Sequence, residues 1–100
     1  MHQFLPYAWF QGKCVPFVDA KVSIATHALH YGTGAFGGMR AIPDPEDSNK
    51  ILLFRADRHA KRLTQSARLL LTELTEETVI EALTALLKAN KPTKPIYLRP

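Results

Sequence analysis

One short segment, residues 27–40, gathers many of the side chains in this chain that could contact a polar aromatic ligand. It contains two histidines, a tyrosine, a phenylalanine, an arginine and four glycines. Glycine permits unusual backbone angles and lets a ligand approach the main chain closely. Tyr31, Phe36 and Arg40 supply a hydroxyl group, apolar surface and a positive charge. These residue types indicate part of a small-molecule site.

Arg62 is the main candidate for binding an anion. At about 100° per residue, it lies beside the apolar arc of its predicted helix, so its stem can pack while its guanidinium reaches into a cleft. A guanidinium can pair with phosphate through two parallel hydrogen bonds. A solvated helix arginine is the ordinary alternative. His59, one turn earlier, could orient Arg62 or approach the phosphate, or it could cap or pack near the helix start.

Strand alternation adds further candidates. Residues 35–42 read as a strand despite their glycines, and the glycine at position 38 would leave room for a ligand. The last strand, at 96–98, has a similar alternation. The residues that would share a face within these two segments are Phe36, Gly38 and Arg40 in the first, and Tyr97 and Arg99 in the second. A core phenylalanine and an ordinary edge-strand tyrosine and arginine are the alternatives.

The elements that must position these residues are predicted from turn, cap and periodicity signals. A hairpin is expected to turn at Gly12, with Pro16 at an edge or bulge, and residues 23–30 form either a short helix or an extended arm. Three further strands are expected at 35–42, 51–54 and 96–98, with a loop at 43–49. This order of strands, two helices and a strand indicates an α+β domain with a mainly antiparallel sheet and two helices on one face.

Two amphipathic helices are expected between the last two strands. The first begins after Asp57 as N-cap, and the second begins after Thr75 and ends at Asn90 and Pro92. Their predicted apolar faces are Leu63, Ala67, Leu70, Leu71 and Leu74 in the first, and Val79, Leu83, Leu86 and Leu87 in the second.

The composition is that of an ordinary soluble globular domain, with 46% hydrophobic and 22% charged residues. The net charge of +4 favours anionic partners, but the basic residues are dispersed and no nucleic-acid-binding motif occurs. No membrane span or signal peptide is expected. Cys14 is the only cysteine, which fits a cytoplasmic protein and a structural thiol. His27 and His30 lack further ligands for zinc, so no metal site is predicted.

Residues 27–40 closely resemble a segment of the branched-chain amino-acid aminotransferases, pyridoxal-phosphate enzymes of fold type IV. Residues 54–63 and 97–100 resemble the same family, in the same order. Gly37 departs from the family form that often has glutamate there. The resemblance covers almost all of this chain but about the first third of the family's length. It implies that residues 1–100 are an incomplete N-terminal small domain, followed in the family by a larger cofactor domain with the catalytic lysine.

The resemblance implies roles for individual residues. Arg62 would hold the phosphate of pyridoxal 5'-phosphate, with His59 beside it. Tyr31 and Phe36 would line the pocket for an aliphatic side chain. The other implied substrate-binding residues are Gly38 and Arg40 close to the active site, Tyr97 at the substrate α-carboxylate, and Arg99 at the distal carboxylate of glutamate.

The implied activity is transfer of an amino group between leucine, isoleucine or valine and 2-oxoglutarate, by a homodimer or higher homo-oligomer. None of the seven lysines, expected in turns, loops or helices, matches the family's Schiff-base lysine, so this chain alone is predicted to be inactive. The alternatives are a D-amino-acid aminotransferase or aminodeoxychorismate lyase of the same fold, and a non-catalytic free-standing module.

Overall fold

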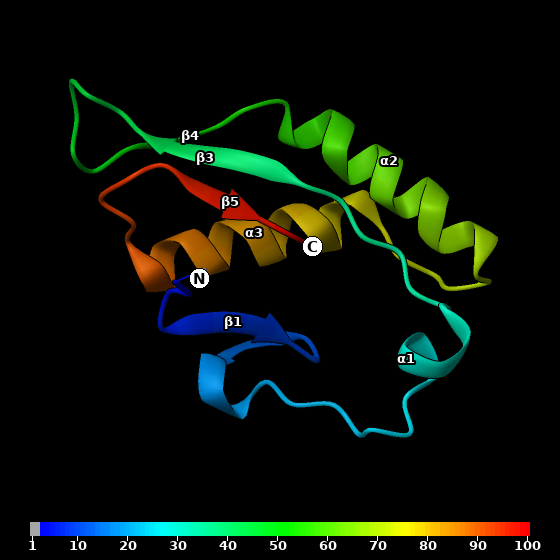
Figure 1. The fold of residues 1–100 in the computed structure, drawn as a ribbon. Coiled ribbons are helices and arrows are strands. Elements are labelled where there is room, and N and C mark those ends of the chain that lie inside the picture. The colour runs from blue at the N-terminus through cyan, green and yellow to red at the C-terminus, as the bar shows by residue number, and fades with distance from the viewer. Residues whose placement is uncertain (1–2) are drawn as a thin grey trace.

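The computed structural model describes residues 3–100, and Figure 1 shows how its elements are arranged. In chain order the elements are β1 (Tyr7–Phe10), β2 (Lys13–Pro16), the 3-10 turn η1 (Phe17–Asp19), α1 (His27–Tyr31), β3 (Met39–Pro43), β4 (Ile51–Leu53), α2 (Ala56–Leu69), α3 (Glu76–Asn90) and β5 (Ile96–Leu98).

The predicted hairpin is present as β1 and β2, an antiparallel two-stranded sheet. Gln11 and Gly12 both have positive φ, of 52° and 84°, as the two central residues of a type I′ turn require. Pro16 pairs with Tyr7 as the last residue of β2. Because both strands are edges, the missing proline N–H is tolerated there.

The second sheet is antiparallel, with the order β4-β3-β5. The predicted strand at 35–42 is wrong over its first part, because β3 begins only at Met39. Gly37 and Gly38 explain the difference, since glycine weakens a strand and has no side chain to pack. The pairing nevertheless continues through one backbone bond, from the Gly37 N–H to the Pro100 carbonyl, at 3.0 Å.

The hydrophobic core lies between the second sheet and the two long helices, α2 and α3. Its buried residues are Met39, Ala41, Ala60, Leu63, Val79, Leu83 and Leu98. They come from β3, β5, α2 and α3, so both long helices cover the same face of the sheet (Figure 1). The predicted α+β class, with an antiparallel sheet and two helices on one face, is confirmed, and α1 adds a third, short helix.

Helix α2 differs from its predicted boundaries. It begins at Ala56, so Asp57 lies in the first turn and is not the N-cap; that position belongs to Arg55, which makes no side-chain capping bond. The carboxylate of Asp57 still suits the positive end of the helix. The helix ends at Leu69, and Leu71, with φ of 58°, is 94% exposed. Neither Leu70 nor Leu71 therefore belongs to the buried face.

Helix α3 matches its prediction. The Thr75 hydroxyl accepts a hydrogen bond from the Thr78 N–H at 3.1 Å, and the helix ends at Asn90. Val79 and Leu83 are buried, and the remaining two predicted residues pack against the core. The Asn90 side chain has a further contact. It accepts a hydrogen bond from the Tyr7 N–H at 2.9 Å and donates one to the Tyr7 carbonyl at 3.0 Å.

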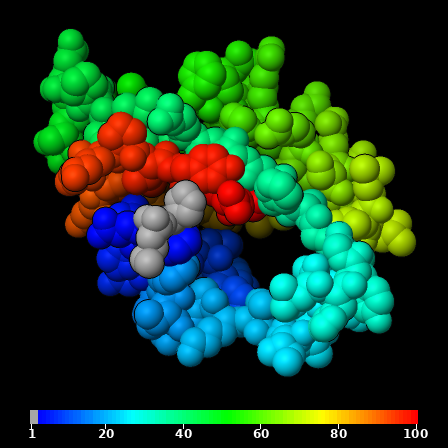
Figure 2. Space-filling view, viewed as in Figure 1, coloured from blue at the N-terminus to red at the C-terminus, as the bar shows by residue number. Residues whose placement is uncertain are grey.

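The segment from residue 20 to residue 38 forms an arm whose first part, with α1, stands away from the core, whereas Ala35 near its end packs against the core. It carries one short helix, α1, in the region where the sequence left a helix and an extended arm open. Figure 2 shows a gap between this arm and the rest of the molecule. The radius of gyration, 14.3 Å, accordingly exceeds the value of about 13 Å that is typical of a compact domain of this length. In residues 3–100 no helix is long and apolar enough to cross a membrane.

Candidate functional site

The face of the second sheet that points away from the helices carries two of the predicted site residues. Arg40 in β3 pairs directly with Tyr97 in β5. Their neighbours Met39 and Leu98 are buried against the helices, so alternation directs Arg40 and Tyr97 to the opposite side. Both are exposed, Tyr97 to 58%. We call this side the open face.

Arg99 joins this group through aromatic contacts. Its guanidinium carbon lies 5.5 Å from the ring centroid of Tyr97 and 5.8 Å from that of Phe36. Both distances are within the range of cation–π attraction. Phe36 itself precedes β3, so strand alternation does not bring it here as the sequence suggested. Its contact with Arg99 does.

Gly38 contradicts one expectation. The sequence predicted room for a ligand above this glycine, but the space is filled by Tyr97. A Cβ built on Gly38 would lie 2.8 Å from Cζ and 2.9 Å from Cε2 of Tyr97, with the hydroxyl oxygen closer still. The tyrosine ring therefore rests against the glycine main chain.

Arg62 reaches from α2 to the beginning of this group. A Cβ built on Gly37 would lie 4.0 Å from Nη2 of Arg62 and 3.9 Å from Cγ of Pro100. The arginine is exposed, so its guanidinium is available to an anion. His59, one turn earlier in α2, is half-buried. Among the hydrogen bonds of residues 3–100, its ring makes none to Arg62.

Tyr31 lies apart from the other predicted residues. It is the last residue of α1, on the arm, and is 73% exposed. Its ring packs edge-on against His27, with centroids 5.2 Å apart. Figure 1 shows α1 well separated from β5. The fold of this chain does not bring Tyr31 to the open face, and its role in binding substrate stays a prediction.

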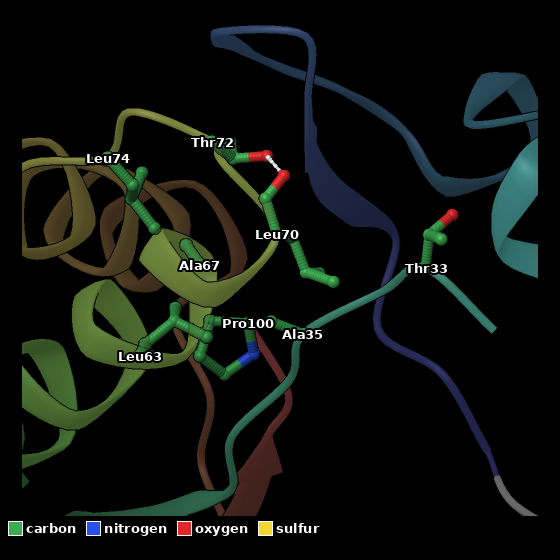
Figure 3. Close-up of a pocket in the computed structure, with 8 residues that line it drawn as sticks. All are labelled: Thr33, Ala35, Leu63, Ala67, Leu70, Thr72, Leu74 and Pro100. Carbon is green, nitrogen blue, oxygen red and sulfur yellow. Dashed lines mark hydrogen bonds between the residues drawn. The ribbon is translucent and has the colours of Figure 1, made fainter.

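An apolar pocket of about 260 Å³ lies between α2 with the loop that follows it, the arm and Pro100, and sequence reasoning missed it. Figure 3 shows its lining residues: Thr33, Ala35, Leu63, Ala67, Leu70, Thr72, Leu74 and Pro100. Its lining residues Leu63 and Ala67 belong to the apolar face predicted for the first long helix, so the helical periodicity indicated part of the pocket wall. Their meeting with Ala35 and Pro100 depends on contacts between distant segments, for which the sequence holds no local signal.

The other chemical groups of the chain are exposed or form no cluster. All seven lysines are exposed, and Lys13 lies in β2 and not in a turn, loop or helix as predicted. Within residues 3–100, no group of three or more His, Cys, Asp or Glu side chains could hold a metal ion. In the same residues, every buried side-chain nitrogen or oxygen has a hydrogen-bond partner.

Comparisons with known sequences identify close relatives, although no protein-family model matches the chain. It is 57% identical over 100 residues to a probable branched-chain-amino-acid aminotransferase of Synechocystis sp., with all of this chain and 33% of the relative covered. It is 37% identical over 97 residues to the branched-chain-amino-acid aminotransferase of Escherichia coli K12, with 94% and 30% covered. The chain thus spans about a third of the length of these relatives.

Comparisons with solved structures agree. The branched-chain aminotransferase of Escherichia coli has a TM-score of 0.84 at 32% identity, with 96% of this chain and 31% of that chain covered. The enzyme of Thermobaculum terrenum, in its PLP-bound holo form, has a TM-score of 0.82 at 26% identity, with 95% and 31% covered. The resemblance predicted from the sequence is confirmed: in sequence and in fold, this chain is homologous to about a third of a branched-chain-amino-acid aminotransferase.

Proposed function

We propose that this chain is the N-terminal part of a pyridoxal-phosphate-dependent transaminase that moves an amino group between branched-chain amino acids and 2-oxoglutarate. The observation that carries the proposal is the 57% identity, over the whole chain, to a probable branched-chain-amino-acid aminotransferase. A D-amino-acid aminotransferase or an aminodeoxychorismate lyase would use the same fold. The sequence identity favours the branched-chain enzymes over both.

The residues around Gly37 fit a phosphorylated cofactor. Arg62 offers an exposed guanidinium, and Gly37 beside it has no side chain to block the approach of an anion. A guanidinium matches phosphate oxygens through paired, charge-assisted hydrogen bonds. Bound pyridoxal phosphate supplies an electron sink for the charge that develops at the substrate Cα. In this proposal Arg62 retains the cofactor and His59 supports the same end of the site.

The open face supplies groups for the substrate. The Tyr97 hydroxyl donates a hydrogen bond to the α-carboxylate, and Arg40 contributes positive charge beside it. Arg99 pairs with the distal carboxylate when the substrate is glutamate or 2-oxoglutarate. With an aliphatic substrate, the Arg99 guanidinium stays in cation–π contact with the rings of Phe36 and Tyr97, whose centroids lie 5.8 and 5.5 Å from its central carbon. A site that accepts both substrate types needs such a partner for the unused charge.

The Schiff-base lysine of the proposed enzyme lies outside residues 1–100. This rests on the resemblance, because none of the seven lysines matches the family's Schiff-base lysine. We therefore expect the 100-residue chain alone to have no transaminase activity. Reduction with borohydride in the presence of pyridoxal phosphate, followed by mapping of the labelled lysines, tests this. A single stoichiometric adduct with activity would contradict it.

We further propose that the complete protein is a cytoplasmic homodimer or higher homo-oligomer. The assembly rests on the resemblance to the aminotransferases, and Tyr31, exposed at the end of α1 on the arm, lies on surface available to a second copy. Exposed apolar side chains on the same arm, Ile24 and Leu29, add to the surface available for association. Sedimentation at assay concentration tests this assembly, and a monomer with full activity would contradict it.

Arg62 provides the sharpest test of the proposed function. In the complete protein, Arg62→Ala should weaken cofactor binding about ten- to hundredfold, since a hydrogen bond to a charged group contributes about 1.5–3 kcal/mol. Arg62→Lys should restore binding only in part, because an ammonium cannot make the paired contact. The measurements are the cofactor dissociation constant and, beside it, the melting temperature.

Arg58→Ala is the matched control for that test. Arg58 is also an exposed arginine of α2, one turn before Arg62. Its removal should change the dissociation constant little. Equal effects at the two positions would overturn the assignment of Arg62. Absence of transfer from L-leucine to 2-oxoglutarate, with transfer from a D-amino acid instead, would favour the alternative enzyme of the same fold.

A further inference from the structure

The contact between Gly38 and Tyr97 follows from the register of β3 and β5. Met39 pairs with Leu98 and Arg40 with Tyr97. The bond from the Gly37 N–H to the Pro100 carbonyl continues this register beyond β3, which sets Gly38 opposite Arg99. Tyr97 is then the diagonal cross-strand neighbour of Gly38, at a separation that a long aromatic side chain can span.

The ring of Tyr97 uses that diagonal. Its hydroxyl-bearing end lies over Gly38, where a Cβ would approach Cζ to 2.8 Å and Cε2 to 2.9 Å. Real Cβ atoms do not approach heavy atoms so closely, so any other residue at position 38 must displace the ring or the main chain. Backbone dihedrals do not explain the glycine, because Gly38 is not among the residues with positive φ.

We infer that Gly38 is a positioning residue whose missing side chain seats the Tyr97 ring and thereby sets where the Tyr97 hydroxyl points. The main chain at Gly38 supports the hydroxyl end of the ring, and the Arg99 guanidinium lies 5.5 Å from its centroid. The ring is otherwise 58% exposed and would have freedom to rotate. The catalytic consequence rests on the proposed function, in which the Tyr97 hydroxyl meets the substrate α-carboxylate.

The other glycines of the same segment separate this effect from a general need for glycine. A Cβ on Gly34 would meet only the Ala28 Cβ, at 3.7 Å, and a Cβ on Gly37 would meet nothing closer than 3.9 Å. Both are ordinary contacts, and neither residue has positive φ. Gly34→Ala, away from the proposed site, is therefore the matched control for Gly38→Ala.

The first experiment measures unfolding of the complete protein. Gly38→Ala should lower the folding equilibrium constant roughly two- to tenfold, the cost of turning the exposed Tyr97 ring off its preferred rotamer. In a Tyr97→Ala background, where the ring is gone, the same change should have little effect. Gly34→Ala should have little effect in either background. If Gly38→Ala is equally harmful with and without the Tyr97 ring, the inference is overturned.

The second experiment measures the kinetics of amino transfer. Gly38→Ala should raise KM for L-leucine at least about tenfold, the effect of losing a hydrogen bond to a carboxylate, while the cofactor dissociation constant stays near its original value. In a Tyr97→Phe background, which lacks the hydroxyl, the further rise in KM should be small. An undiminished rise there would overturn the inference.

The two experiments distinguish failure of this inference from failure of the proposed function. A protein without transaminase activity would refute the proposed function and, with it, the catalytic consequence, whereas the dependence of Gly38→Ala on the Tyr97 ring would still be measured by unfolding. Loss of that dependence in an active transaminase would refute the seating of Tyr97 alone.

Discussion

Two regions of this chain, the layer of sheet and long helices and the arm, differ in how far they bury their apolar side chains. In the layer formed by the second sheet, α2 and α3, Met39, Ala41 and Leu98 are buried. On the arm, Ile24 is 84% exposed and Leu29 67% exposed. Apolar character is common to both regions, so it does not decide burial. Burial requires a second element to pack against. On the arm Ala35 packs against the core, whereas Ile24 and Leu29 are largely exposed in the described residues 3–100.

The hydrogen bonds of the two regions differ in the same way. The sheet is held by pairing of β3 with β4, the next strand along the chain, and with β5, which α2 and α3 separate from it in sequence. The arm uses local contacts, such as the bonds from the Thr26 N–H to the Ser23 carbonyl and from the Ala25 N–H to the Ser23 hydroxyl. Except for Tyr31, the predicted site residues lie near the boundary between the regions, where Phe36 and Gly38 lead from the arm into β3. At this boundary the paired strands of the second sheet continue into the arm, whose apolar side chains are largely exposed.

The largest expected effect tests the burial difference directly. In the 100-residue chain, Leu83→Ala should lower the free energy of unfolding by about 2–5 kcal/mol, because it leaves a cavity in the core; Leu83 is 4% exposed. Leu29→Ala, on the arm, should change it by about 0.5 kcal/mol or less. Urea unfolding of both variants supplies the numbers. Similar losses at the two leucines would mean that the arm is packed as tightly as the core.

A smaller effect is expected at the joint between the hairpin and the helical layer. Asn90→Ala removes both hydrogen bonds to Tyr7, and each contributes about 0.5–1.5 kcal/mol. The free energy of unfolding should therefore fall by about 1–3 kcal/mol. Amide hydrogen exchange of β1 should rise with it. Asn49→Ala, in an exposed loop, is the control, and a loss of the same size there would show that the joint has no special contribution.

The smallest effect concerns a helix end within the packed layer. Thr75→Ala removes the cap of the Thr78 N–H, so the free energy of unfolding should fall by about 1 kcal/mol. Thr84→Ala, in the exposed middle of α3, should leave it unchanged or raise it slightly, because alanine has the higher helix propensity. Thermal unfolding followed by circular dichroism distinguishes them. If the two variants behave alike, capping does not determine the start of α3.

Local signals in the sequence were sufficient for several elements. The hairpin was predicted from one glycine between two apolar runs, because a two-residue turn needs positive φ. Thr75, Asn90 and the apolar spacing between them predicted α3, because caps and periodicity act within one or two helical turns. The resemblance of three short segments to one family was equally readable. The α+β class followed from the order of these elements.

Local signals were not read correctly at several other places, and only some of these are decided by distant segments. They did not show that α2 ends before Leu70, that β3 begins only at Met39, or that the apolar pocket exists. They also suggested open space above Gly38, which the ring of Tyr97 fills. The pocket and the contact at Gly38 depend on partners that lie far away in the sequence, whereas α2 ends in local backbone bonds to the Ala67 and Arg68 carbonyls.

The sequence by itself determined which residue types were available to the site, and where the hairpin and α3 would form. The tertiary structure decided which of those residues meet. It brought Arg62 to Gly37 and left Tyr31 on the arm. The physical reason is that caps, turns and periodicity depend on neighbours along the chain, whereas the contact between Gly38 and Tyr97 depends on the register of two strands that the two long helices separate in sequence.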